Sequence, residues 1–294
     1  MTLKRLSLSP TNFAPTSRLL VRRTWWAKPP SSRLTYTSPM NSLFDVKGKV
    51  VLVTGGSRGI GEMIARGFVD AGAKVYISSR KAEVCDALAS ELSEHGECIS
   101  LPADLSTEAE CRRLAEEMAN REDHLDVLVN NAGATWGAPM AEFDETAFER
   151  VLALNVKGVF HLTKFLRPLL EASASAEVPS RVINIGSIDG IHVPTLETYA
   201  YSASKAAVHQ LTRHMAKAMA PNVTVNAIAP GPFESKMMKA TLDAFGDSIA
   251  AAAPMKRIGR PSDMAGTAIF LASPAASYIT GVILPVDGGI ATLA

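Results

Sequence analysis

The sequence predicts a single α/β domain of the doubly wound type, with a seven-stranded parallel sheet and helices on both of its faces. Three observations lead to this fold class. Short apolar runs alternate with longer amphipathic stretches from residue 45 onward, as in right-handed strand–helix–strand units. A glycine-rich turn follows the first apolar run. The 294 residues are 47% hydrophobic and 20% charged, which is typical of a globular protein with a full core.

The predicted elements follow one another in a regular order. Strands are expected at the short apolar runs 50–53, 74–79, 98–101, 127–129, 181–185, 223–228 and 282–286. Helical spacing is expected over 61–71, 82–94, 107–120, 145–171 and 198–219, the fourth being one long helix or a helix pair. Val84, Leu88 and Leu92 are expected to form the buried face of the second helix. No repeat or linker-like stretch interrupts residues 45–294, so one domain is predicted there.

Residues 1–44 differ from the rest of the chain in charge. They hold seven basic and no acidic residues, which leaves 23 basic and 29 acidic residues in 45–294, a net charge of −6. A basic, acid-free leader rich in Ser and Thr is typical of an organelle transit peptide, so a mitochondrial location is expected. A tail without a targeting role, and translation that begins at Met40, are the alternatives, and both predict a cytoplasmic protein.

Other classes of protein find no support in the sequence. No apolar run reaches the ~20 residues that a membrane-spanning helix needs. The net charge of +1 does not indicate a nucleic-acid partner. Cys85, Cys98 and Cys111 share no metal-ligand spacing, so no metal site is expected and the thiols are predicted to be reduced.

The first predicted strand runs into the turn Thr54-Gly55-Gly56-Ser57-Arg58-Gly59-Ile60-Gly61. Glycine there permits a tight turn, close approach of the backbone to a pyrophosphate, and close packing of helix on strand. The phosphates of a dinucleotide would then meet the free N–H groups of the helix N-terminus. A Walker-type loop is excluded, because it needs Lys after its last glycine and this chain has Glu62. The predicted cofactor contacts in the turn are Gly55, Ser57, Arg58, Gly59, Ile60 and Gly61.

The end of the second predicted strand indicates which dinucleotide binds. An NAD site places Asp or Glu there, but this chain has Ser78-Ser79-Arg80-Lys81. A carboxylate would repel a 2′-phosphate, whereas Arg80 can pair with it, and Arg58 in the turn can reach the same group. NADP(H) is therefore the predicted cofactor. Both arginines would be solvated surface charges in the alternative interpretation.

Three motifs together resemble the short-chain dehydrogenase/reductase family. They are the glycine turn at 54–61, Asn130-Asn131-Ala132-Gly133 after the fourth strand, and Tyr201-x-x-x-Lys205. The resemblance extends from about residue 46 to the C-terminus. It implies a Rossmann-type fold and an enzyme that interconverts a ketone and a secondary alcohol.

Tyr201 and Lys205 make chemical sense as a pair. They lie four residues apart on one predicted helix and so share a face. A free tyrosine has a pKa of about 10, and a nearby ammonium is expected to lower that pKa. The resemblance implies that Tyr201 is the catalytic acid/base and that Lys205 also binds the nicotinamide ribose. Tyr199 lies off this face and is expected to be a packing residue.

Two further residues complete a predicted catalytic tetrad. Ser187 directly follows a strand, where ligands bind in doubly wound sheets, and would hold the substrate carbonyl oxygen. A nucleophilic serine is the rival, but Gly186-Ser187-Ile188-Asp189-Gly190 is not the hydrolase elbow. Asn155 interrupts an apolar helical stretch. The resemblance implies that it kinks the helix and holds a water that serves Lys205, and a satisfied polar residue is the alternative.

The resemblance also assigns cofactor contacts outside the glycine turn. Asp104 and Leu105 match an adenine-contacting pair, and Pro230, Gly231 and Ser235 match the loop that contacts the nicotinamide amide. The remaining predicted contacts, after the fourth strand, are Asn131, Ala132 and Gly133.

The substrate is expected to be a small carbonyl compound bound under residues 232–253. Met237, Met238, Leu242 and Phe245 could give that segment an apolar face over the ligand, or it could be a helix packed on the core. The chain resembles 3-oxoacyl-thioester (acyl-carrier-protein) reductases, including the rhamnolipid-type branch, which implies fatty acid or polyketide metabolism. The segment 171–179 is acidic rather than basic, which is unsuited to an acidic carrier protein.

Alternatives remain for both activity and assembly. A hydrophobic secondary-metabolite ketone, a secondary-alcohol dehydrogenase and a non-catalytic NADP-binding sensor or scaffold are the other functions considered. The resemblance implies a homodimer or homotetramer. The apolar faces of residues 159–170 and 208–219 suit such a contact, and they suit burial against the sheet equally.

Overall fold

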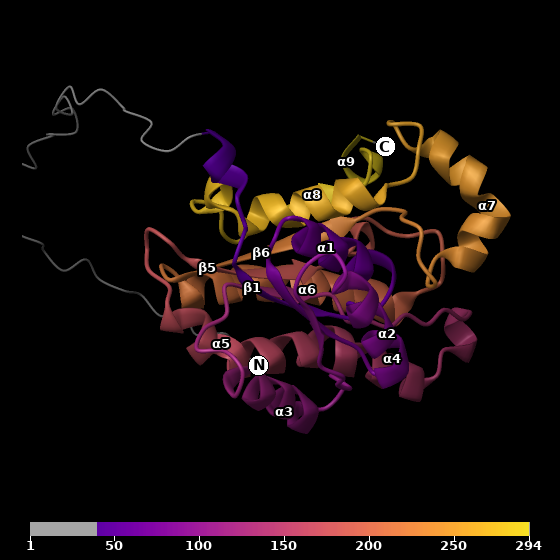
Figure 1. Cartoon of the computed structure of the whole chain (residues 1–294). Helices are drawn as coiled ribbons and strands as arrows, with labels where there is room; N and C mark the ends of the chain where they lie inside the picture. Colours follow the sequence, from indigo (N-terminus) through magenta and orange to yellow (C-terminus); the bar gives the residue numbers. More distant parts are fainter. Residues whose placement is uncertain (1–39, 294) are drawn as a thin grey trace, which may run out of the picture. The chain divides into compact units, whose positions relative to one another are not determined.

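A computed structural model of the chain describes residues 40–293 (Figure 1). The leader predicted at residues 1–44, with its targeting role and the alternative start, lies outside the described residues except for its last five. Those five form a short 3-10 helix, Met40–Phe44 (η1). The fold that positions the site begins at residue 50.

One parallel sheet of seven strands runs through this part of the chain in the order β3-β2-β1-β4-β5-β6-β7. The strands are β1 Val50–Thr54, β2 Lys74–Ser78, β3 Cys98–Ser100, β4 Val127–Asn130, β5 Ser180–Ile185, β6 Val223–Pro230 and β7 Ile283–Val286. The predicted doubly wound fold is confirmed. The order reverses between β1 and β4, and ligands bind at the carboxyl ends of strands beside such a switch point.

Every stretch predicted to be helical forms a helix, and α8 and α9 are helices that were not predicted. They are α1 Gly59–Asp70, α2 Ala82–Leu92, α3 Glu108–Ala119, α4 Glu145–Leu152, α5 Val159–Ala172, α6 Tyr199–Met219, α7 Lys239–Ala252, α8 Pro261–Ala272 and α9 Ile290–Leu293. The stretch predicted as one helix or a pair is α4 and α5, joined by the π-helical turn Ala153–Gly158 (η3). The predictions did not include α8, whose apolar residues lie on more than one side and give weak helical contrast.

Helices cover both faces of the sheet, as predicted (Figure 1). Alternate residues of β1 divide between the two layers, Val51 and Val53 joining the core under α1, α2 and α8. Leu52 joins the other core, which is formed with α3, α5 and α6. The buried side chains of α5 therefore face the chain's own sheet, which is the second of the two interpretations given for residues 159–170.

One predicted core residue is wrong. Val84 is 43% exposed, and Cys85 is buried in its place beside Leu88 and Leu92. The buried face of α2 is thus rotated by one position from the predicted stripe. The cause lies in the next layer, because the Cys85 thiol contacts the β2 backbone and donates to the Ile77 carbonyl over 3.4 Å.

Candidate active site

The glycine turn joins β1 to α1 with a backbone that suits a dinucleotide. Gly55 and Gly59 have φ of +63° and +57°, which favours glycine. A Cβ on Gly61 would lie 2.3 Å from the Gly55 carbonyl oxygen, so only glycine allows this helix to start so close to the strand. Arg58 precedes α1 and makes no side-chain cap, which leaves the first N–H groups of the helix free for an anion.

The loop after β4 braces this turn from the side. The Asn131 side-chain amide donates to the carbonyl oxygens of Thr54 and Gly55 over 2.9 and 3.1 Å. The Thr54 hydroxyl in turn accepts from the backbone N–H groups of Asn131 and Ala132. The side chain of Asn131 therefore fixes the shape of the turn, which places this predicted contact behind the site.

Two cations lie beside the end of β2. Thr54 and Ser78 are paired at the ends of β1 and β2, so Arg58 and Arg80 follow neighbouring strand ends. Both arginines are exposed, and neither forms a salt bridge within residues 40–293. The residues that follow β2 are Ser79, Arg80 and Lys81, none of which is acidic. The space beside the ends of β1 and β2 can therefore bind a phosphate.

The predicted adenine contacts differ in their exposure. Asp104 is half-buried, and its carboxylate accepts from the Ser106 backbone over 3.2 Å. Leu105 belongs to the core, and its carbonyl oxygen would lie 2.5 Å from a Cβ placed on Gly158. Leu105 therefore packs the loop against the π-helical turn rather than presenting its side chain to the surface.

The loop after β6 folds over the glycine turn. Gly231 donates its N–H to the Val286 carbonyl over 3.0 Å, and a Cβ on it would lie 2.7 Å from that of Asp287. Ser235, which is 3.1 Å from the Cβ position of Gly59, caps the Met238 backbone over 3.2 Å. The structure thus brings together two segments that were predicted to contact the same cofactor.

Ser187, Tyr201 and Lys205 meet at the carboxyl end of β5. Ser187 follows β5, and its hydroxyl lies close enough to the Tyr201 phenol to act on the pKa of that group. The Lys205 ammonium donates to the Ile185 carbonyl over 2.8 Å and lies 5.4 Å from the centre of the Tyr201 ring. Tyr199 instead packs edge-on against Phe143 and hydrogen-bonds Glu197, as expected of a packing residue.

The protonation behaviour of the pair differs from the expectation. Burial raises the pKa of Tyr201 to about 12, while the Ser187 hydroxyl acts to lower it. Burial lowers the pKa of Lys205 to about 8, and the Asp189 carboxylate acts to raise it. The expected lowering of the Tyr201 pKa by Lys205 is not found, because the ammonium faces the Ile185 carbonyl and burial is the dominant effect.

Asn155 lies in the π-helical turn and joins two elements. Its side-chain oxygen accepts from the Ala134 N–H over 2.8 Å, and its amide donates to the Ala134 carbonyl and to the Ser204 hydroxyl, each over 2.9 Å. Gly133 passes between Asn155 and Lys205, since its Cβ position is 3.4 Å from the Asn155 oxygen and 3.8 Å from the Lys205 nitrogen. Asn155 thus holds the loop after β4 against α6.

The sequence interpretation missed His209, which supports the same loop as Ser187. It is four residues beyond Lys205 on the buried face of α6. Its ring lies against both glycines that flank the Ser187 turn: Cβ positions on Gly186 and Gly190 would be 2.2 and 2.8 Å from ring atoms. Burial lowers the pKa of His209 to about 4, so the ring is neutral. The helical spacing from Lys205 was the available signal.

The segment predicted as a lid forms α7, and no residue of this helix is buried. Figure 1 shows α7 standing apart from the sheet, beyond the strand ends. Met237 and Phe245 are 46% and 60% exposed, and Leu242 is half-buried. The alternative of a helix packed on the core is therefore wrong.

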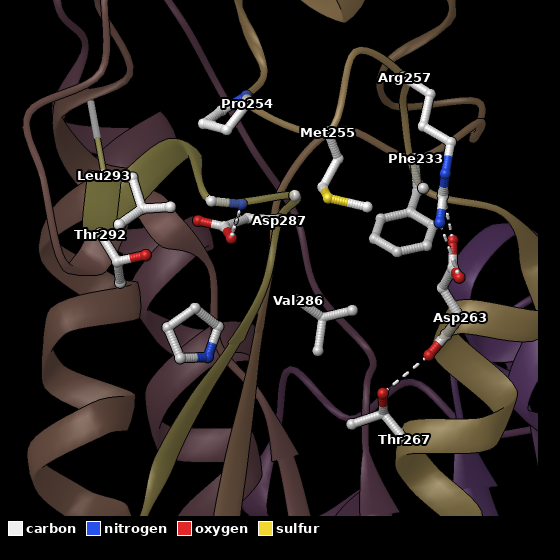
Figure 2. Close-up of a pocket in the computed structure, with 14 residues that line it drawn as sticks. Phe233, Pro254, Met255, Arg257, Asp263, Thr267, Val286, Asp287, Thr292 and Leu293 are labelled. Atoms are coloured by element: carbon white, nitrogen blue, oxygen red, sulfur yellow. Dashed lines mark hydrogen bonds and ion pairs between the residues drawn. The ribbon is translucent and has the colours of Figure 1, made fainter.

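A cavity of about 590 Å³ lies beside the site, at the carboxyl end of β7 (Figure 2). Its polar groups are already paired: Asp287 accepts from the Gly289 and Ala291 backbones, and Arg257 forms a two-pronged ion pair with Asp263. None of Asn155, Ser187, Tyr201 and Lys205 lines it. Its lining consists of Phe233, Pro254, Met255, Arg257, Gly259, Asp263, Thr267, Pro285, Val286, Asp287, Gly288, Gly289, Thr292 and Leu293.

The part of the chain that the structure describes offers neither a metal site nor a membrane-spanning helix. Between residues 40 and 293, no three His, Cys, Asp or Glu side chains are grouped in a way that could hold a metal ion. No helix in the same range is long and apolar enough to cross a membrane.

Comparison with known proteins identifies the family. A family profile described as "Enoyl-(Acyl carrier protein) reductase" matches residues 55–291. The chain is 49% identical over 257 residues to the rhamnolipids biosynthesis 3-oxoacyl-[acyl-carrier-protein] reductase of Pseudomonas aeruginosa, covering 85% of this chain and 99% of that protein. It is 35% identical over 257 residues to the 5-keto-D-gluconate 5-reductase of Escherichia coli, covering 85% and 98%.

Solved structures agree with this assignment. The Pseudomonas aeruginosa RhlG/NADP active-site complex superposes with a TM-score of 0.83 at 48% identity, covering 86% of this chain and 100% of that one. An actinorhodin polyketide ketoreductase with NADPH gives a TM-score of 0.77 at 30% identity, covering 83% and 98%. The chain therefore belongs to the short-chain dehydrogenase/reductase family.

Proposed function

We propose that this chain is an NADPH-dependent ketone reductase whose substrate is a 3-oxoacyl thioester. The observation that carries the reaction class is the meeting of Ser187, Tyr201 and Lys205 at the carboxyl end of β5, on the same edge of the sheet as the glycine turn and separated from it by β4. The thioester rests on the 49% identity to a 3-oxoacyl-[acyl-carrier-protein] reductase. The apolar, exposed side chains of the α7 segment suit an acyl chain.

The cofactor assignment fits the residues present. The glycine turn and the uncapped start of α1 would hold the pyrophosphate, and Arg58 and Arg80 would pair with the 2′-phosphate. Lys205 would hold the nicotinamide ribose, and the loop from Pro230 to Ser235 the nicotinamide amide. NADPH supplies, when bound, the hydride that reduces the carbonyl carbon.

Side chains of the protein bind the substrate carbonyl oxygen and supply the proton that it receives. The hydroxyls of Ser187 and Tyr201 donate hydrogen bonds to the substrate oxygen as negative charge develops on it. Tyr201 then gives up its proton to that oxygen, and the Ser187 hydroxyl, which acts to lower the pKa of Tyr201, stabilises the phenolate left behind. Asn155 keeps the loop after β4 beside Lys205, where the family relationship assigns it a water that restores the proton.

The first test measures the loss of NADPH absorbance with acetoacetyl-CoA, with NADH as the parallel cofactor. Turnover with a clear preference for NADPH is expected. In Tyr201→Phe, turnover should fall by about 10²–10⁴-fold, as expected for a lost general acid. Tyr199→Phe is the matched control and should retain turnover, because its hydroxyl only bonds Glu197. Near-normal turnover by Tyr201→Phe would contradict the assignment of the acid.

We also propose a homodimer or homotetramer and a mitochondrial location. The first rests on family membership and on Phe160, which is 44% exposed on the outer side of α5. Sedimentation analysis with a Phe160→Glu variant tests it, and a purely monomeric wild-type protein would contradict it. The second rests on the charge of residues 1–44 alone.

A further inference from the structure

Asp189 is a half-buried acidic residue beside the catalytic serine that no part of the proposed reaction uses. It lies two residues after Ser187 in the short 3-10 turn Ile188–Gly190 (η4), and its backbone N–H donates to the Ser187 hydroxyl over 3.1 Å. That turn packs against α6, the helix that carries Tyr201 and Lys205. The backbone of Asp189 is therefore fixed two residues from the serine that would hold the reacting carbonyl.

The fold gives the Asp189 carboxylate no partner. Within residues 40–293 it forms no salt bridge and accepts no hydrogen bond, and the bond to Ser187 uses only the backbone. Burial raises the pKa of Asp189, and the charges of His192 and Lys205 act to lower it. An uncharged side chain would make the same turn without the cost of partial burial. The charge is thus not explained by the turn's stability.

The charge acts on the reacting groups instead. The turn that carries Asp189 packs against α6, and the Asp189 carboxylate acts to raise the pKa of both Tyr201 and Lys205 on that helix. A substrate with its own carboxylate near the ketone would meet this field at short range in a partly desolvated site, where like charges repel strongly. A neutral ester or thioester at the same position would not.

We propose that Asp189 is a specificity residue that excludes keto acids and admits ketones that are uncharged around the carbonyl, such as thioesters. This inference rests on the proposed ketone reduction by Ser187, Tyr201 and Lys205. It adds to that function a charge filter at the site itself.

The test compares two small ketones that differ in charge two bonds from the carbonyl, acetoacetate and ethyl acetoacetate, with the full chain and NADPH. The wild type should prefer the ester, measured as the ratio of the two kcat/KM values. In Asp189→Asn, which keeps the size of the side chain and the backbone bond, the ratio should fall about tenfold. Asp189→Ser is a second uncharged variant, in case the first fails to fold.

Glu197→Gln is the matched control, because it removes one negative charge from the same loop at an exposed side chain that bonds only Tyr199. Its ratio should equal that of the wild type. An unchanged ratio in both Asp189 variants, with the ester still reduced, would overturn the charge filter and leave the proposed function in place. If the wild type reduces none of acetoacetate, ethyl acetoacetate and acetoacetyl-CoA, both the charge filter and the proposed function are overturned.

Discussion

The contact between Gly186 and His209 permits a quantitative test of how the Ser187 turn is held. A methyl group on Gly186 would lie 2.2 Å from Nε2 and 2.7 Å from Cδ2 of the His209 ring. Ordinary contacts need about 3.5 Å or more. The backbone of Gly186 cannot retreat easily, because its N–H donates to the Ile228 carbonyl over 2.7 Å. The ring is only 5% exposed and has Gly190 on its other side.

The expected cost follows from this lack of room. Gly186→Ala should lower the free energy of unfolding by about 1–3 kcal/mol, the usual cost of overpacking a core. His209→Ala should cost roughly 2–4 kcal/mol, because it leaves a cavity between α6 and the turn. In the double variant the new methyl group occupies part of that cavity. Its cost should be smaller than the sum of the single costs by about 1–3 kcal/mol.

Urea unfolding followed by far-UV circular dichroism measures the free energy of unfolding of the wild type, the two single variants and the double variant. Gly246→Ala is the control, because no atom lies within 4 Å of its Cβ position and it lies in α7. That change should be neutral or slightly stabilising. The reasoning would be refuted by a Gly186→Ala variant as stable as the wild type, or by costs that simply add in the double variant.

Three further outcomes are expected. Arg80→Asp should lower kcat/KM for NADPH by about 10- to 100-fold, because a charge-assisted bond to the 2′-phosphate is lost, and should raise kcat/KM for NADH. Arg58→Ala should lower kcat/KM for NADPH and leave kcat/KM for NADH unchanged. Equal losses of kcat/KM with both cofactors would contradict the assignment of these arginines to the phosphate. The pKa of His209 falls from its ordinary 6.5 to about 4 on folding. The unfolded chain therefore binds more protons in that range, and about 2 kcal/mol of stability should be lost between pH 7.5 and 5. Urea titrations at both pH values should show this dependence weakened in His209→Ala but kept in His214→Gln, an exposed control on α6; an unchanged dependence in His209→Ala would contradict the neutral buried ring. A reporter fused to residues 1–44 should enter mitochondria, and a cytoplasmic reporter would favour the untargeted alternative.

The sheet could be predicted because its central strands, β1, β4, β5 and β6, are buried on both faces. Each strand of such a sheet is a nearly unbroken apolar run, which needs no knowledge of its neighbours. Helix faces were less certain: Val84 and Cys85 are both apolar, and only contact with the β2 backbone decides which one is buried. The helix α8 lacks the polar stripe that periodicity requires.

The site could be predicted in its residues but not in its energetics. The spacing of Tyr201 and Lys205 places them on one face, yet it does not reveal how deeply they are buried, and burial decides both pKa values. The partners of Asn155 come from a distant loop and from α6, so no local pattern contains them. His209 was overlooked because a histidine on an apolar helix face resembles an ordinary core residue until its contact with the Ser187 turn is seen.

The lack of any buried residue in α7 has a consequence for how this protein can change. A segment that adds nothing to the core can be exchanged for another of different length or sequence at little cost in stability, because lengthening a surface loop costs only about 0.6 kcal/mol per doubling. The helix α7 itself, between Lys239 and Ala252, could therefore be exchanged with little loss of core packing. An exchange there would leave Asn155, Ser187, Tyr201, Lys205 and the glycine turn in place, because none of them belongs to α7.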